Sequence, residues 1–329
     1  MAQERKARVI DLHAHINIVP ARALMNAART SPPKPAKPGS GGLSDKAKAP
    51  ILSQIDARLS SMDGMGVDLA LLTPSPPPGF YKTDEETGGA VARVTNDEVA
   101  RIARDHADRI LSTGNVALQH VDASIAELER GMAIGLKGMR IGTNIGGIEL
   151  GDRRFDPFWA RAEQLGALIF LHPQGFTEPK RLDAYYLDNA VGNPLETTLA
   201  LAQMIFGGVF ERYPRLKLIA AHGGGYFPFY VGRFEQAWRT RPECRVNLAR
   251  APGEVLTQIW FDTVLFRPDQ VAFLVNLVGR DKVVMGTDSP YDMGENDPVA
   301  LIRATPGLDA AAQSAILGGN AERLLGLAG

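Results

Sequence analysis

The chain has 329 residues, of which 45% are hydrophobic and 22% charged, and its formal net charge is −1. This balance is that of an ordinary soluble globular protein, and without a basic stripe it argues against a nucleic-acid partner. No apolar run approaches the ~20 residues of a membrane span, and the N-terminus lacks a signal peptide's apolar segment. The single cysteine, Cys244, fits a reducing compartment. We therefore expect a cytoplasmic protein.

Short apolar segments alternate with helical patterns along the chain, which predicts parallel βα units. The helical patterns include residues 95–106, 125–133, 157–163 and 197–206. The predicted strands span residues 8–15, 67–73, 110–116, 136–142, 167–172, 216–222, 258–264 and 283–288. Eight such units favour one (β/α)₈ TIM barrel, a single domain over residues 1–329, rather than an open sheet.

One segment interrupts this alternation. Residues 30–50 are rich in Pro, Gly, Lys and Ser, a composition that cannot form a packed core. We predict an insertion of about residues 17–55 after the first strand, on the face of the barrel where active sites lie. It is either a surface loop or a lid over the site. Residues 74–89, after the second strand, form a second irregular stretch at the same face.

Most of the histidines lie at the carboxyl ends of predicted strands. His13 and His15 are two residues apart on the first strand, so their side chains share a face. His172, His222 and Asp288 each follow an apolar strand into a turn. In a barrel these ends converge on one rim. Each residue alone could be structural, but five convergent ones indicate a metal site.

Imidazole and carboxylate ligands suit Zn²⁺, Mn²⁺, Fe²⁺ or Co²⁺. Three histidines and one aspartate with room for water are typical of a catalytic rather than a structural site, because the ion makes the bound water more acidic.

The motifs Asp-Leu-His13-Ala-His15, His222-Gly-Gly-Gly and Gly-Thr-Asp288-Ser-Pro, together with the His172 strand, occur in the order found in the amidohydrolase superfamily. The chain resembles its aminocarboxymuconate semialdehyde decarboxylase branch from about residue 8 to the C-terminus. The resemblance implies that His13, His15, His172 and Asp288 bind one metal ion. It also implies that His222 stays off the metal as a catalytic acid/base, a role that suits a histidine near neutral pH.

The fourth strand lacks the modified lysine that bridges two ions in binuclear members of the superfamily. Lys137 should point outward, whereas Gly138, Arg140 and Gly142 should face inward, so we expect a mononuclear site. Zn²⁺ is our first choice and Mn²⁺ the second, with no organic cofactor. Asp11 has the same strand parity as the two histidines and could support a ligand from behind.

Four residues are candidates for substrate binding. Arg140 could hold a substrate carboxylate bidentately or pair with a rim acid such as Asp11. Arg233 matches an arginine that the family contributes from the neighbouring subunit, which implies a homodimer, although it could also be a surface residue. Phe227 and Tyr291 flank the His222 and Asp288 motifs and could line the pocket or simply pack.

The sequence therefore predicts a metal-dependent, non-oxidative decarboxylase of a small unsaturated or aromatic carboxylic acid. In this scheme His222 moves the proton, and Asp288 both ligates and shuttles. Hydrolysis of a lactone or amide, or hydration of an unsaturated acid, would use the same residues. The family's decarboxylase also uses an arginine in the first insertion, where this chain offers only Lys46 and Lys48. That departure leaves the exact substrate open.

Overall fold

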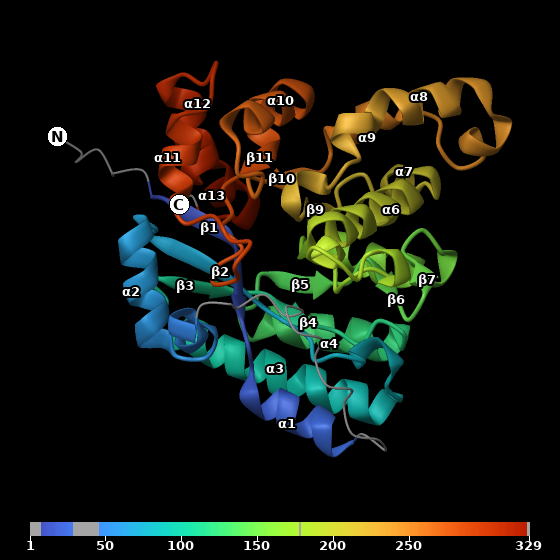
Figure 1. Cartoon of the computed structure of the whole chain (residues 1–329). Coiled ribbons are helices and arrows are strands. Elements are labelled where there is room, and N and C mark those ends of the chain that lie inside the picture. Colours follow the sequence, from blue (N-terminus) through green and yellow to red (C-terminus); the bar gives the residue numbers. More distant parts are fainter. Residues whose placement is uncertain (1–7, 29–45, 178, 328–329) are drawn as a thin grey trace.

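The computed structural model describes residues 8–28, 46–177 and 179–327. Its parallel strands form the predicted (β/α)₈ barrel (Figure 1). In barrel order the strands are β1 (Ile10–Ile16), β2 (Leu69–Pro74), β3 (Ile110–Ser112), β4 (Gly114–Asn115), β5 (Gly138–Ile141), β8 (Leu168–Leu171), β9 (Lys217–Ala220), β10 (Trp260–Asp262) and β11 (Val283–Val284). β3 and β4 share one position, interrupted at Thr113. The barrel closes where the backbone N–H of Leu12 donates to Met285 O at 2.9 Å.

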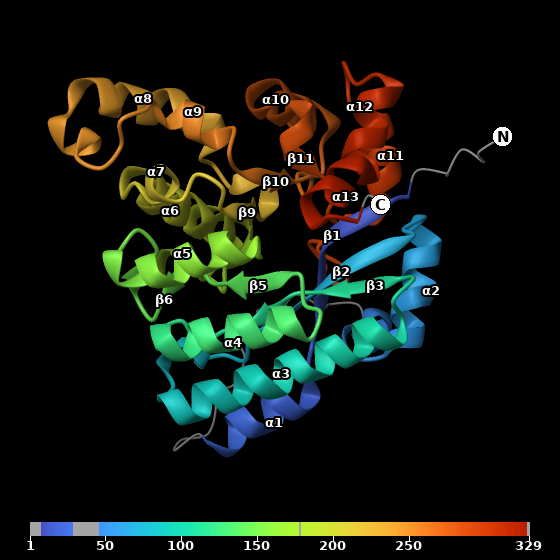
Figure 2. The same ribbon diagram turned by 180° about the vertical axis from the view of Figure 1, so that it is seen from behind.

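Helices surround the strands, and in the view of Figure 2 α4 and then α3 lie below β3 and β5. Their bounds are α1 (Val19–Ala27), α2 (Ile55–Met65), α3 (Glu85–Asp105), α4 (Val121–Ala133), α5 (Asp156–Leu165), α6 (Asn193–Phe206), α7 (Val209–Arg212), α8 (Val231–Thr240), α9 (Pro252–Leu256), α10 (Pro268–Val278), α11 (Pro298–Arg303), α12 (Ala310–Ser314) and α13 (Asn320–Leu325). A short hairpin, β6 (Asn144–Ile145) and β7 (Ile148–Glu149), follows β5. Among the described residues, none of the helices combines the length and apolar character that crossing a membrane requires.

Two buried clusters separate the inside of the barrel from the layer between strands and helices. Leu168 and Phe170 of β8 pack with Ile10 and Leu12 of β1 in the inner cluster. Ile169, the intervening residue, belongs to the larger outer cluster. This alternation is what the twofold period of strand side chains predicts, and it fills the barrel below the catalytic face.

The first strand departs from simple alternation. Its register against β2 shifts between Asp11 and Ala14, so an extra residue enters the strand, as in a β-bulge. Leu12 therefore packs in the inner cluster, while His13 and His15 also face the site. The parity that we predicted for Asp11 is wrong for this reason. Its carboxylate Oδ1 instead accepts the backbone N–H groups of His13, at 2.9 Å, and Thr287, at 3.1 Å.

Two further boundaries in the structure differ from those predicted from the sequence. α3 begins at Glu85, inside the stretch predicted to be irregular, because Asp84 caps it by accepting the Thr87 N–H at 2.7 Å. Within this helix a Cβ on Gly88 would meet Ala117 Cβ at 2.8 Å, so glycine permits the close approach there. The predicted insertion of residues 17–55 contains α1 and the 3₁₀ turn Lys46–Leu52. Its residues 29–45 lie outside the described part of the chain, so the lid stays a prediction.

Candidate metal centre

Four side chains from three parts of the barrel rim meet at one point. His13 and His15 lie on β1, His172 directly follows β8, and Asp288 lies in the loop after β11. One ligand atom from each lies within 4.8 Å of all the others, and all four residues are buried. The carboxyl ends of distant strands converge here, as expected for the catalytic face of a barrel.

The distances within this cluster fit a bound cation. Nε2 of His15 lies 3.1 Å from Nε2 of His13 and 2.8 Å from Asp288 Oδ1. Nε2 of His172 is buried and has no hydrogen-bond partner among the described residues. A buried nitrogen without a partner costs free energy, and an ion bound by these atoms would remove that cost. Three imidazoles and a carboxylate are a ligand set typical of transition-metal ions. The cluster is therefore a His/Asp metal site.

Burial and neighbouring charges shift the pKa values of the three histidines in the cluster. Burial opposes protonation of His13, yet Asp288 and Asp262 outweigh it and raise the pKa of His13 to about 10. Burial lowers the pKa of His15 to about 4. Burial and the adjacent charge of Arg140 hold the pKa of His172 well below its ordinary value. Two of the three imidazoles are therefore neutral at pH 7, the form that binds metals.

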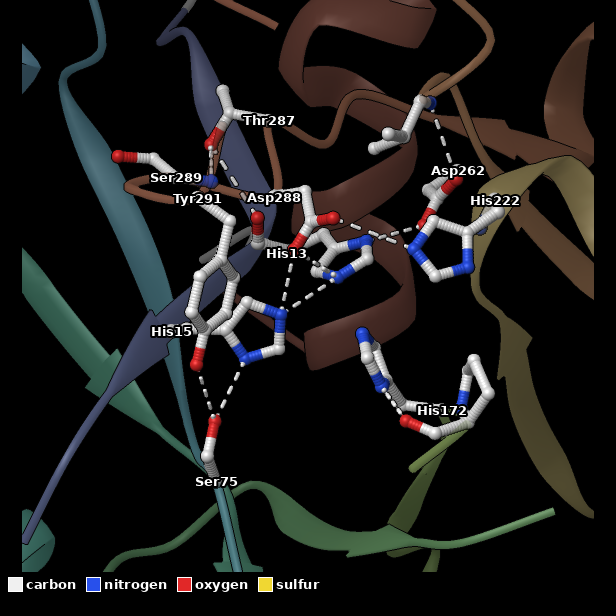
Figure 3. A network of polar contacts seen from close by, with 12 residues as sticks. His13, His15, Ser75, His172, His222, Asp262, Thr287, Asp288, Ser289 and Tyr291 are labelled. Carbon is white, nitrogen blue, oxygen red and sulfur yellow. Dashed lines mark hydrogen bonds and ion pairs between the residues drawn. The ribbon is translucent and has the colours of Figure 1, made fainter. Parts of the chain in front are cut away.

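The outer nitrogen of each ligand histidine is fixed by a different partner. Nδ1 of His13 lies 2.6 Å from the buried carboxylate of Asp262 (Figure 3). Nδ1 of His172 lies 2.6 Å from the carbonyl oxygen of Pro173. At His13 the carboxylate beside Nδ1 places the proton there and leaves the Nε2 lone pair for an ion. Nδ1 of His172 also lies 2.8 Å from the donor Nη2 of Arg140, so its two contacts hold the ring without fixing its tautomer.

His15 is held by a chain of hydroxyl groups. Ser75 Oγ lies 3.4 Å from His15 Nδ1 and 3.2 Å from the hydroxyl of Tyr291. The Tyr291 ring also lies against His15, with 4.9 Å between ring centroids. Tyr291 thus contacts His15 directly through its ring, and its hydroxyl is linked to His15 only through Ser75 (Figure 3).

His222 lies next to the four-residue cluster but outside it. Its Nε2 is 3.4 Å from Asp288 Oδ2, and its Nδ1 is buried without a hydrogen-bond partner in the described part of the chain. The backbone of His222 is left-handed, with φ of 55°, which is uncommon for a residue other than glycine. The glycines that follow permit this turn, because a Cβ on Gly225 would meet Pro194 O at 2.1 Å.

A buried arginine on α2 joins strand β1 to the loop that carries Asp288. Arg58 is 1% exposed, and its guanidinium donates to the backbone carbonyl of His15. It also lies 3.3 Å from Ser289 Oγ, beside Asp288. Asp288, like His222, has left-handed backbone geometry, with φ of 57°. Arg58 therefore helps to hold a strained loop in place.

A cavity of about 400 Å³ opens onto the cluster. Arg140 lines it and is 3% exposed. Its Nη2 lies 2.8 Å from His172 Nδ1, while Nε and Nη1 have no hydrogen-bond partner among the described residues. The other lining residues are His15, Ser75, Pro76, Pro78, His172, Pro173, Gln174, Gly175, Tyr186, Asp188, Asn189, Asn193, His222, Asp288 and Tyr291.

The remaining candidates lie away from this cavity. Phe227 is fully buried and stacks on Phe234 with ring centroids 4.1 Å apart, which is the position of a core residue. Arg233 is exposed on α8. Lys48 donates to Asn296 Oδ1 at 3.0 Å, and the side chain of Lys46 lies outside the part of the structure that is described.

Two residues of the site were missed in the sequence. Asp262 stands in Trp-Phe-Asp-Thr, two residues before the end of the predicted strand 258–264, so it lacked the strand-end position that singled out Asp288. Arg58 gave no signal, because an arginine within a helical segment is usually exposed.

The sequence matches a protein-family model over nearly the whole barrel. The model, described as amidohydrolase, matches residues 10–327. The chain belongs to the amidohydrolase family. A 2-amino-3-carboxymuconate-6-semialdehyde decarboxylase from Dictyostelium discoideum is 37% identical over 274 residues, covering 83% of this chain and 76% of that protein.

Solved structures of amidohydrolase barrels have the same fold. A 2,6-dihydroxybenzoate decarboxylase in complex with 2,6-dihydroxybenzoate superposes with a TM-score of 0.85 at 24% identity, covering 98% of this chain and 99% of the other. A dihydroxybenzoic acid decarboxylase from Polaromonas, with bound manganese and the inhibitor 2-nitroresorcinol, has a TM-score of 0.83 at 21% identity, and 97% of each chain is covered.

Proposed function

We propose that this amidohydrolase is a metal-dependent carboxy-lyase that removes CO₂ from a small unsaturated or aromatic carboxylic acid. The observation that carries the proposal is the cavity that three residues of the His/Asp cluster share with His222 and the buried Arg140. The similarity to the Dictyostelium decarboxylase supports the reaction type.

The surroundings of Arg140 support an anionic substrate. The structure gives its guanidinium no ion pair within the described residues, although the side chain is buried. A buried charge without a counter-ion costs several kcal/mol. A substrate carboxylate in the cavity would provide that counter-ion and accept from the unpartnered Nε and Nη1. Arg140 would thereby orient the acid, with Tyr291, which also lines the cavity, as a second contact.

His222 is the residue that we assign to proton transfer. Decarboxylation breaks the bond between the carboxyl carbon and the ring or alkene carbon and leaves the electron pair on the latter. His222 would deliver a proton to that carbon and recover one from solvent. Its place beside Asp288 Oδ2, at 3.4 Å, suits this role because a carboxylate can orient the imidazole and exchange the proton with it.

The ion would be held by His13, His15, His172 and Asp288. It would supply Lewis acidity to a substrate oxygen. We propose Zn²⁺ as the resident ion, because imidazole-rich sites suit it, with Mn²⁺ as the alternative, since the Polaromonas relative binds manganese. One ion per chain is expected, since Lys137 precedes β5 at its amino end, whereas the ligands lie toward or beyond the carboxyl ends of their strands.

The reaction can be tested on a panel of aromatic acids, unsaturated acids and lactones. We expect metal-dependent CO₂ release from at least one acid and no hydrolysis of the lactones. Release of an acid from a lactone without CO₂ would instead establish the hydrolase, and water addition to an alkene would establish the hydratase.

We further propose a homodimer in which α8 of each subunit supplies Arg233 to its partner's site. α8 has no fully buried residue, and in Figure 1 it lies at the edge of the barrel. The preceding turn exposes Tyr230, and Phe229 stacks on the exposed Phe273 with ring centroids 4.7 Å apart. Clustered exposed aromatic side chains are typical of an association surface.

A further inference from the structure

Asp262 joins two parts of the site that the chain brings together from different strands. It ends β10 and is fully buried. Its Oδ2 lies 2.6 Å from His13 Nδ1 and accepts the backbone N–H of His222 at 3.1 Å. Its Oδ1 accepts the backbone N–H of Gly223 at 3.0 Å. One carboxylate thus contacts a metal ligand and also the turn that presents His222 (Figure 3).

The first contact decides where His13 carries its proton. A neutral imidazole has one N–H, and an acceptor at Nδ1 places it there. Nε2, which faces His15 and Asp288, then keeps its lone pair. The negative charge of Asp262 also makes His13 a more basic ligand.

The second contact holds a strained turn. A left-handed residue other than glycine costs on the order of 1–3 kcal/mol and persists only when its surroundings hold it. His222, with φ of 55°, is followed by Gly223 with φ of 59°. Both residues donate their backbone N–H to Asp262. The position of the His222 imidazole beside Asp288 therefore depends on this carboxylate.

We propose that Asp262 is a positioning residue that fixes the tautomer of His13 and the turn of His222 through one side chain. A residue that only filled this space would be apolar, since burying a carboxylate carries a desolvation cost. The inference rests on the proposed function only where it names His222 as the proton carrier. It links the affinity of the centre for its ion to the placement of the proton-transferring group.

Asp262→Asn tests both consequences, because the amide keeps the shape but loses the charge. Zn²⁺ affinity is measured by competition with a chromogenic chelator, and kcat at saturating Zn²⁺, in the wild-type and His222→Asn backgrounds. We expect Zn²⁺ to bind ~10–100-fold more weakly in both backgrounds. Turnover should fall in the wild-type background but little further in His222→Asn, because Asp262 acts on turnover through His222. Unchanged Zn²⁺ affinity, or equal losses of kcat in both backgrounds, would overturn the proposal.

Asp11→Asn is the matched control. It makes the same change at a buried carboxylate that accepts from the backbone N–H groups of His13 and Thr287 and from the Thr287 hydroxyl. That carboxylate contacts neither the His13 imidazole nor the His222 turn. Its effect on kcat should be the same in both backgrounds. If Asp11→Asn also loses its effect in His222→Asn, the coupling is not specific to Asp262 and the proposal fails.

A measurement on the unmodified protein covers the case in which Asp262→Asn does not fold. In the Zn²⁺-loaded protein with ¹⁵N-labelled histidine, NMR should show a proton on Nδ1 of His13 that exchanges slowly with water. An unprotonated Nδ1 would refute the assignment. This result and the Zn²⁺ affinities need no substrate, so they remain decisive if the protein proves not to be a decarboxylase.

Discussion

The guanidinium of Arg140 lies against a metal-ligand imidazole, with Nη2 2.8 Å from Nδ1 of His172. The imidazole carries no negative charge, so the contact leaves the positive charge of the arginine uncompensated. A cation in this position helps to keep His172 neutral, because it lowers the imidazole pKa further than burial alone. It also leaves the guanidinium free to bind an anion in the cavity.

Replacing Arg140 by leucine should therefore weaken substrate binding without unfolding the protein. Losing hydrogen bonds to a charged group costs about 1.5–3 kcal/mol, so KM should rise roughly 10–150-fold. The melting temperature without substrate should stay level or rise, because an unpaired buried charge is removed. The control is Arg153→Leu, which alters an exposed ion pair with Asp156 and should leave KM unchanged. A lower melting temperature with an unchanged KM would make Arg140 a structural residue.

His222 and His172 should respond differently to substitution, since only His172 belongs to the ligand cluster. His222→Asn should keep its metal and lose ~10²–10⁴-fold in kcat. His172→Ala should lose the metal itself. Elemental analysis of both purified variants, next to the wild type with one ion per chain, separates the roles. Equal metal loss in the two variants would make His222 a ligand.

Metal loading should depend on pH through His13. Asp288 and Asp262 raise its pKa to about 10 against the effect of burial, so the metal-free protein holds a proton there at neutral pH. An ion must displace that proton, and its apparent affinity should rise about tenfold per pH unit up to about pH 10. His15, with a pKa of about 4, adds nothing in this range. Calorimetry of Zn²⁺ binding in buffers of different ionisation enthalpy measures the released proton, and an affinity independent of pH would contradict this account.

The shared Arg233 can be tested with two inactive variants, Arg233→Ala and His172→Ala. After subunit exchange, one site of a mixed dimer carries both defects and the other carries neither. Up to about half of the normal activity per mixed dimer should return. No recovery, despite exchange shown by mass spectrometry, would mean that Arg233 does not act across an interface.

The sequence predicted the barrel because apolar periodicity is a local property of each strand. It also predicted which strand ends meet, since the barrel brings them to one rim. It did not predict the bulge in β1, which shifts Asp11 out of step with His13. A bulge depends on pairing with a neighbouring strand, which the pattern of one strand does not contain.

The supporting residues were harder to predict than the ligands. Asp262 and Arg58 act through contacts with residues far away in the sequence, such as His13 and Ser289. Their surroundings arise only when the barrel closes. Phe227 shows the converse, because its place beside the His222 motif left pocket lining and packing both open, and the turn directs it onto Phe234.

The most direct test of the central claim follows a substrate labelled with ¹³C in the carboxyl group, turned over in D₂O by the metal-loaded enzyme. We predict one ¹³CO₂ and one deuterium on the vacated carbon per turnover, with both lost in His222→Asn. Retention of ¹³C in the product, with incorporation of oxygen from water, would contradict decarboxylation and identify a hydrolase or hydratase.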